Sequence, residues 1–116
     1  MERILIDLNQ VAGVKGSMVV TKEGVVVAEA LGPDLETESV AAVSSHVIQV
    51  AERALESLGR SAFEQFTMTS AHGRMVFVNL DVGYLVVITK MEMRLEQVAI
   101  EVESAARKIR GMGKRI

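Results

Sequence analysis

Apolar residues recur at helical spacing in three stretches of the chain, a periodicity typical of helices with one buried side. The predicted helices cover about residues 2–12, 38–58 and 93–110. The second helix is followed by Gly59, a residue type that commonly terminates helices. The pattern therefore predicts a helix near each end of the chain and a long helix in the middle.

Five other stretches are rich in β-branched and apolar residues and are separated by short turns, which is typical of strands. These predicted strands cover about residues 17–21, 25–30, 63–69, 74–80 and 84–89. The order is therefore helix, two strands, helix, three strands, helix. Because the strand-to-strand connections are short, the hairpin partners must be antiparallel.

Four of the predicted strands are apolar at consecutive positions, so both of their faces are expected to be buried. The runs are Met18–Val20, Val25–Ala28, Met75–Val78 and Leu85–Ile88. An antiparallel sheet with one wet face would instead alternate apolar and polar residues. We therefore expect an α+β fold, with a central five-stranded antiparallel sheet and helices on both faces. The length of the chain fits one domain over residues 1–116.

The strand over residues 63–69 differs from the others, because apolar and polar residues alternate in it. This alternation suits a strand at the margin of the sheet. A free edge exposes unpaired N–H and C=O groups and is usually blunted by charge, by proline or by a cover. The segment Phe66, Thr67, Met68 and Thr69 carries no charge and no proline, so we expect it to pair with another chain.

The long middle helix has an apolar arc that fills about half of its circumference at about 100° per residue. The arc could belong to a deeply seated core helix, or part of it could meet a second copy. The small side chains of Ala41, Ala42, Ser44 and Ser45 would permit a close helix approach. The polar side is expected to stay wet or to touch a polar partner, and it collects His46, Gln49, Glu52, Arg53 and Glu56. The interface residues predicted on this helix are Val40, Ala41, Ser44, Ser45, Ile48, Gln49 and Glu52.

Composition excludes several classes of protein. The net charge is −2, only 3% of residues are aromatic, and no basic stripe precedes Lys114 and Arg115, so nucleic-acid binding is not expected. The chain has no cysteine, which removes disulfides and thiolate chemistry. Its apolar runs are too short for a membrane span, and its first residues do not form a signal-peptide core. We expect a soluble, cytoplasmic protein.

Candidate catalytic and ligand-binding motifs are weak. The segment over residues 13–17 lacks the spacing of a phosphate-binding loop and precedes a strand. Ser45 and His46 are adjacent on a helix and therefore point about 100° apart, which is unsuitable for a nucleophile and its base. His46 and His72 have no metal-ligand spacing. We expect no catalytic residues, cofactor or metal, and hence no enzyme.

With this element order, two stretches resemble the Roadblock/dynein-light-chain family. Residues 11–20 (VAGVKGSMVV) and 22–28 (KEGVVVA) look like the end of its first helix, a strand and a glycine-turned hairpin. Residues 83–89 (GYLVVIT) look like the strand before its last helix. The resemblance spans nearly the whole chain and implies a profilin-like architecture and a homodimer. In such proteins the third strand pairs with its copy, and the second helices pack together on one face.

The resemblance also implies a function without catalytic residues of its own. Family members regulate or scaffold small Ras-like GTPases, and the prokaryotic members nearest in kind act on a bacterial Ras-like GTPase. Arg53 and His46 would then be candidate GTPase contacts, with Arg53 as a possible arginine finger. The alternative is a structural adaptor of a motor or membrane-associated complex with no GTPase partner. Both functions use the same dimer surfaces, so the sequence does not separate them.

Overall fold

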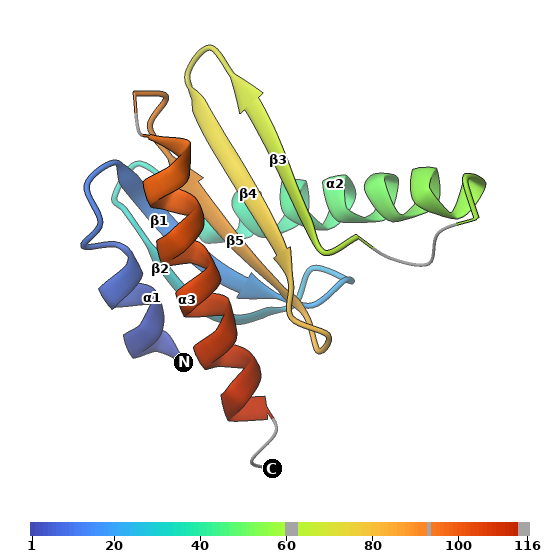
Figure 1. Cartoon of the computed structure of the whole chain (residues 1–116), viewed down its shortest axis with the longest axis horizontal. Helices are drawn as coiled ribbons and strands as arrows, with labels where there is room; N and C mark the ends of the chain where they lie inside the picture. Colours follow the sequence, from blue (N-terminus) through green and yellow to red (C-terminus); the bar gives the residue numbers. More distant parts are fainter. Residues whose placement is uncertain (60–62, 93, 114–116) are drawn as a thin grey trace.

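The structure, a computed structural model, describes residues 1–59, 63–92 and 94–113. Within these residues the element order is the predicted one, with three helices and five strands. Figure 1 shows how they are arranged. The bounds are α1 Glu2–Leu8, β1 Val14–Val20, β2 Val26–Leu31, α2 Thr37–Ser57, β3 Gln65–Ser70, β4 Gly73–Asn79, β5 Tyr84–Thr89 and α3 Leu95–Gly113.

The strands form one antiparallel sheet in the order β2-β1-β5-β4-β3. The two hairpins, β1–β2 and β3–β4, are joined through β5, which lies in the middle. Among the described strands, β3 pairs with β4 alone and therefore lies at one edge, while β2 lies at the other. The prediction that the alternating strand lies at the margin of the sheet is confirmed.

Helices cover both faces of the sheet, as the continuous apolar runs predicted. The helices α1 and α3 lie on one face and α2 lies on the other (Figure 1). Alternate residues of β5 supply the two cores, with Leu85 and Val87 facing α3 and with Val86 facing α2. Phe77 of β4 is fully buried on the α2 side. The predicted α+β fold class is confirmed.

Three local predictions are wrong. The first helix ends at Leu8 rather than near residue 12, and β1 already begins at Val14. The early start is possible because Val14 pairs with Thr89 and Gly16 with Ile88, across a bulge that accommodates the intervening residue. On β2, Val25 and Val27 are exposed rather than buried, because the register with β1 shifts at this point.

Within the described ranges, no helix combines the length and the apolar character needed to cross a membrane.

Candidate functional site

The strand β3 presents an open backbone edge. Its register with β4 pairs Gln65 with Val78 and runs without interruption to Ser70 and Gly73. One residue before the strand, the carbonyl of Glu64 accepts a bond from the N–H of Asn79 at 2.9 Å. Because the direction of backbone hydrogen bonding alternates along an antiparallel strand, the even-numbered residues of β3 direct their N–H and C=O groups toward β4. We infer that Gln65, Thr67 and Thr69 direct their N–H and C=O groups away from the sheet.

The apolar arc of α2 divides into a buried side and an exposed side. On the buried side, Ile48 is fully buried against the sheet, together with Val40 and Ala41. On the exposed side, Val43 and Val50 each leave 49% of their surface accessible, and Leu58, just past the helix, leaves 76%. We call this side the apolar stripe, and it consists of the exposed Val43, Val50, Ala54 and Leu58 together with the half-buried Val47.

The C-terminal part of the apolar stripe and the open edge lie at the same margin of the molecule. Figure 1 shows the C-terminal half of α2 extending past β3, the last strand of the sheet. This half carries Val50, Ala54 and, at its end, Leu58. Successive stripe residues are separated by three or four positions, which is the spacing of a helix-packing seam.

A buried polar cluster attaches α2 to the rest of the fold. Glu52 is only 7% exposed and accepts a hydrogen bond from the hydroxyl of Tyr84, on the middle strand β5. Its second carboxylate oxygen lies 3.0 Å from the ammonium of Lys22, in the β1–β2 turn. Glu52 was expected on a wet face, and that prediction is wrong. A buried carboxylate is stable only when donors surround it, as Tyr84 and Lys22 do here.

The same contacts shift the ionisation of all three groups. Burial alone would raise the pKa of Glu52, but the hydrogen bonds from Tyr84 and Lys22 and the charge of Lys22 lower the pKa overall. The pKa of Tyr84 is raised by its burial and by the adjacent carboxylate. The pKa of Lys22 is raised by its hydrogen bond and its charge interaction with Glu52. Glu52 and Lys22 therefore form an ion pair at neutral pH.

The β1–β2 turn is also held to α2 through its backbone. The carbonyl of Lys22 accepts hydrogen bonds from Ser45 Oγ at 2.9 Å and from Gln49 Nε2 at 3.3 Å. The Ser45 hydroxyl therefore donates its hydrogen bond to the turn and not to the neighbouring imidazole of His46, which is exposed. The turn and the middle of the helix are thus fixed relative to one another.

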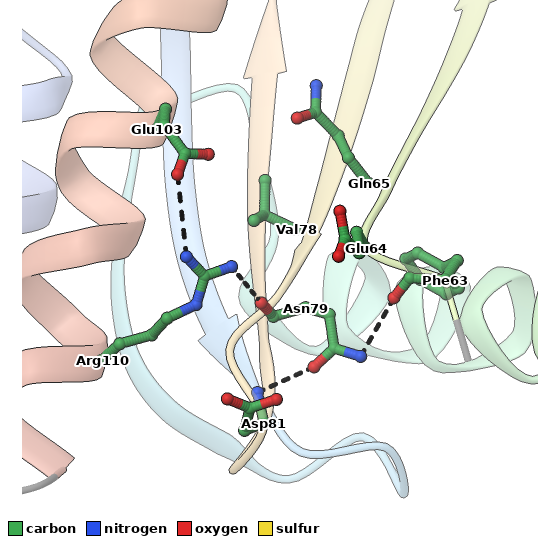
Figure 2. A pocket seen from close by; sticks show the side chains of 8 residues that line it. All are labelled: Phe63, Glu64, Gln65, Val78, Asn79, Asp81, Glu103 and Arg110. Carbon is green, nitrogen blue, oxygen red and sulfur yellow. Dashed lines mark hydrogen bonds and ion pairs between the residues drawn. The ribbon is translucent and has the colours of Figure 1, made fainter. Parts of the chain in front are cut away.

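A polar hollow of about 530 Å³ lies where the C-terminal half of α3 meets the β4–β5 turn (Figure 2). Arg110 donates to the Asn79 carbonyl at 2.6 Å and lies 3.8 Å from Glu103. The Asn79 side chain donates to the Phe63 carbonyl and accepts from the N–H of Asp81. Because these contacts already engage the guanidinium, we assign Arg110 to fastening α3 to the sheet.

The histidine and acidic side chains of the described residues lie apart from one another as far as metal binding is concerned. Within residues 1–59, 63–92 and 94–113, no group of three or more histidine, aspartate or glutamate side chains could hold a metal ion. His46 is exposed on α2, and His72 is exposed in the β3–β4 turn.

The interface residues proposed from the sequence separate into two groups. One group is accessible at least in part: His46, Gln49, Arg53, Phe66, Thr67, Met68 and Thr69. The other group is buried within the chain itself: Val40, Ala41, Ser44, Ser45, Ile48 and Glu52. Of the small residues predicted to permit a close helix approach, Ala41, Ser44 and Ser45 are buried within the chain itself, whereas Ala42 is exposed. The exposed residues Val43, Val50 and Leu58 belong to the apolar arc of α2. The helical periodicity of the sequence does not distinguish them from the buried residues of the same arc.

Comparison with known proteins agrees with this fold. Residues 1–89 match the Roadblock/LC7 domain. An uncharacterized protein of Methanocaldococcus jannaschii, MJ0714, is 38% identical over 112 residues, which are 97% of this chain and 95% of that protein.

Solved structures show the same architecture. Myxococcus xanthus MglB superposes with a TM-score of 0.90 at 18% identity, over 99% of this chain and 95% of that one. A structure described as MglB with tetrameric arrangement has a TM-score of 0.85 at 13% identity, over 97% and 87% of the two chains. Profilin II of Acanthamoeba castellanii has a TM-score of 0.60 at 16% identity over 93% and 95%, which confirms the predicted profilin-like architecture. Because a Roadblock/LC7 match covers most of the sequence and an MglB-like fold covers nearly all of it, the chain belongs to the Roadblock/LC7 family.

Proposed function

We propose that the protein is a homodimeric platform that binds a small Ras-like GTPase and influences its nucleotide state without catalytic residues of its own. The observation that carries the proposal is the coincidence of two unpartnered features at one margin, the open edge of β3 and the apolar stripe of α2. A single partner that is a second copy can satisfy both.

The geometry of β3 restricts how two copies would pair. Directly opposed residues of an antiparallel pair lie on the same face of the sheet. If a twofold axis keeps both α2 helices on one face, opposed residues must therefore both be odd-numbered or both even-numbered. The axis then passes through a residue rather than between two residues. An axis at Thr67 opposes Gln65 to Thr69 of the copy and uses the outward groups of all three residues.

The C-terminal half of α2 that extends past β3, which we call the overhang, fits the same arrangement. On the α2 side of the β3–β4 hairpin lies a mainly apolar hollow of about 400 Å³, with Met68, Met75 and Ile88 among its lining residues. The twofold axis that pairs the β3 strands carries the overhang of one copy toward this hollow of the other. Burial of Leu58 and Val50 there would remove apolar surface from water, which contributes about 1.5–3 kcal/mol for each fully buried side chain.

The outer ridge of α2 is the surface proposed for the GTPase. Arg53 follows His46 by seven residues, so the two side chains project within about 20° of one another. Both are exposed. The family resemblance points to a GTPase as the partner, and such a partner would need only binding and conformational bias from this surface. A GTP-dependent partner also implies a cytoplasmic protein.

The decisive experiment passes cell lysate from the source organism over the immobilised protein, once with GDP and once with a non-hydrolysable GTP analogue. Retention of a Ras-like GTPase in one nucleotide state supports the proposal, and its hydrolysis rate with and without the protein is measured next. A partner set that contains no GTPase and is indifferent to nucleotide contradicts it and favours the structural adaptor. Sedimentation equilibrium of the purified chain tests the homodimer separately.

A further inference from the structure

A second groove runs along α2 on the side away from the apolar stripe. Gly24 and Val26 line it from the β1–β2 hairpin, and Ala41 and Ala42 line it from the helix, with a volume of about 340 Å³. At about 100° per residue, Ser45 projects opposite to the middle of the apolar stripe, and Ala42 projects about 120° from it. The proposed dimer would therefore leave this groove open on each copy. We call it the hairpin groove.

The floor of the hairpin groove is formed by small residues. Gly24 has a positive φ of 94°, and a Cβ built there would lie 3.1 Å from the Cβ of Ser45. A larger residue at position 24 would therefore press on the helix. The hydrogen bond from Ser45 to the Lys22 carbonyl holds the hairpin and the helix at this separation. The hollow is thus a fixed feature of the fold.

The mouth of the groove is acidic. Glu23 and Glu38 line it and are exposed. In the part of the chain that the structure describes, neither lies within ion-pair distance of a basic group, because the ammonium of Lys22 contacts Glu52 and attracts Glu23 only at longer range. From residue 23 to residue 52 the sequence contains no lysine and no arginine. An apolar hollow with two unpaired carboxylates at its mouth fits a ligand that is apolar in the middle and cationic beside it.

We propose that the hairpin groove binds a segment of a partner protein in which one large apolar side chain is flanked by lysine or arginine. The apolar side chain enters the hollow between Val26 and Ala42, and the flanking cations lie against Glu23 and Glu38. Exposed ion pairs contribute little individually, so the affinity arises mainly from apolar burial and depends on salt through the charges. The proposal does not depend on a GTPase partner, because an adaptor would use the same groove.

Selection from a phage-displayed library of random short peptides tests the proposal. The wild-type chain is the bait, and one enriched peptide is then titrated against it by fluorescence anisotropy. We expect enriched peptides to carry an apolar residue flanked by lysine or arginine. We expect the Ala42→Arg variant to bind such a peptide at least about tenfold more weakly, because its side chain enters the groove and repels the cations. The matched control is Ile100→Arg, which adds the same charge at an exposed position of α3.

A second variant keeps the test independent of any folding defect in the first. The double change Glu23→Gln and Glu38→Gln removes the charges with little change in shape and is expected to weaken binding and to flatten its salt dependence. Amide shifts in NMR spectra of the wild-type chain should concentrate at Val26, Ala41 and Ala42. The proposal is overturned by absence of enrichment, by enriched peptides without basic residues, by shifts elsewhere, or by equal binding to well-folded Ala42→Arg.

Discussion

Tyr84 and Glu52 link the middle strand of the sheet to the C-terminal half of the long helix through one buried hydrogen bond. The two residues are 32 positions apart in the sequence. Lys22 reaches the same carboxylate from the β1–β2 turn, so three separate elements meet at Glu52. This contact fixes the position of α2 on the sheet. It therefore also determines where the apolar stripe and the hairpin groove lie.

Replacement of Tyr84 by phenylalanine should destabilise the chain by about 2 kcal/mol. The change leaves the Glu52 carboxylate buried with one donor fewer, and hydrogen bonds to charged groups contribute about 1.5–3 kcal/mol. Phenylalanine keeps the ring, whose centroid lies 5.4 Å from that of Phe63, so packing is retained. Urea denaturation of the variant and of wild type measures the difference. A loss below about 0.5 kcal/mol would show that the hydrogen bond is not important for stability.

Glu52 should also make stability depend on acidic pH. Its folded-state pKa lies below the ordinary carboxyl value of 4.5, so the unfolded chain binds more protons in acid. Its contribution is therefore complete above the unfolded pKa and is lost as the pH falls through the folded pKa. Denaturation midpoints from neutral to acidic pH should fall less steeply for Glu52→Gln than for wild type. The control variant Glu101→Gln, at an exposed position, should follow the wild-type slope.

The element order and the edge position of β3 could be predicted because both depend on local patterns. Continuous apolar runs marked β1, β4 and β5, which are buried on both faces, although the run at Val25–Ala28 did not mark such a strand. The alternation from Phe66 to Thr69 marked the marginal strand. The β-bulge after Val14 could not be predicted, because it depends on pairing with Thr89 at the other end of the chain. A local pattern contains no information about a partner strand that is distant in the sequence.

The burial of Glu52 was missed for the same reason. A helical wheel assigns a carboxylate to the wet side unless its donors are known, and these donors come from β5 and from the β1–β2 turn. The apolar arc of α2 was recognised from its periodicity, but the position of the sheet decides which residues of the arc are buried. Ile48 is buried against the sheet, whereas Val50 is exposed.

Thr67→Pro should convert the proposed homodimer into a folded monomer. Proline is tolerated on an edge strand when its missing N–H faces away from the sheet, and the alternation of β3 places the N–H of Thr67 on that side. The pairing of β3 with β4 should therefore survive, while pairing with a second copy loses a central donor. Sedimentation equilibrium measures the change in mass, and circular dichroism measures the retained fold.

Thr67→Val is the matched control, because it keeps the backbone N–H and a β-branched side chain. It should remain dimeric. A dimeric, folded Thr67→Pro variant would exclude self-pairing centred at Thr67.

Val50→Arg should separate the copies without destabilising the protomer. Half of the Val50 surface is exposed, so the added charge stays in water in the monomer, where surface substitutions change stability by about 0.5 kcal/mol or less. In the dimer the charge would be buried against the apolar stripe or the hollow at Met68. The control is Val82→Arg, an exposed valine in the β4–β5 turn that lies on neither surface. If the two variants dimerise equally well, the apolar stripe of α2 is not part of the dimer interface.

Arg53→Ala should weaken binding of the proposed GTPase and leave the dimer intact. Arg53 is exposed on the outer ridge of α2, so truncation removes a donor for the partner with little loss of buried surface. Hydrolysis should be measured at saturating concentrations of the variant, so that weaker binding is not mistaken for lost stimulation. Full stimulation at saturation assigns Arg53 to binding alone. Loss of stimulation with binding retained would instead make Arg53 an arginine finger, because such a residue stabilises the transition state.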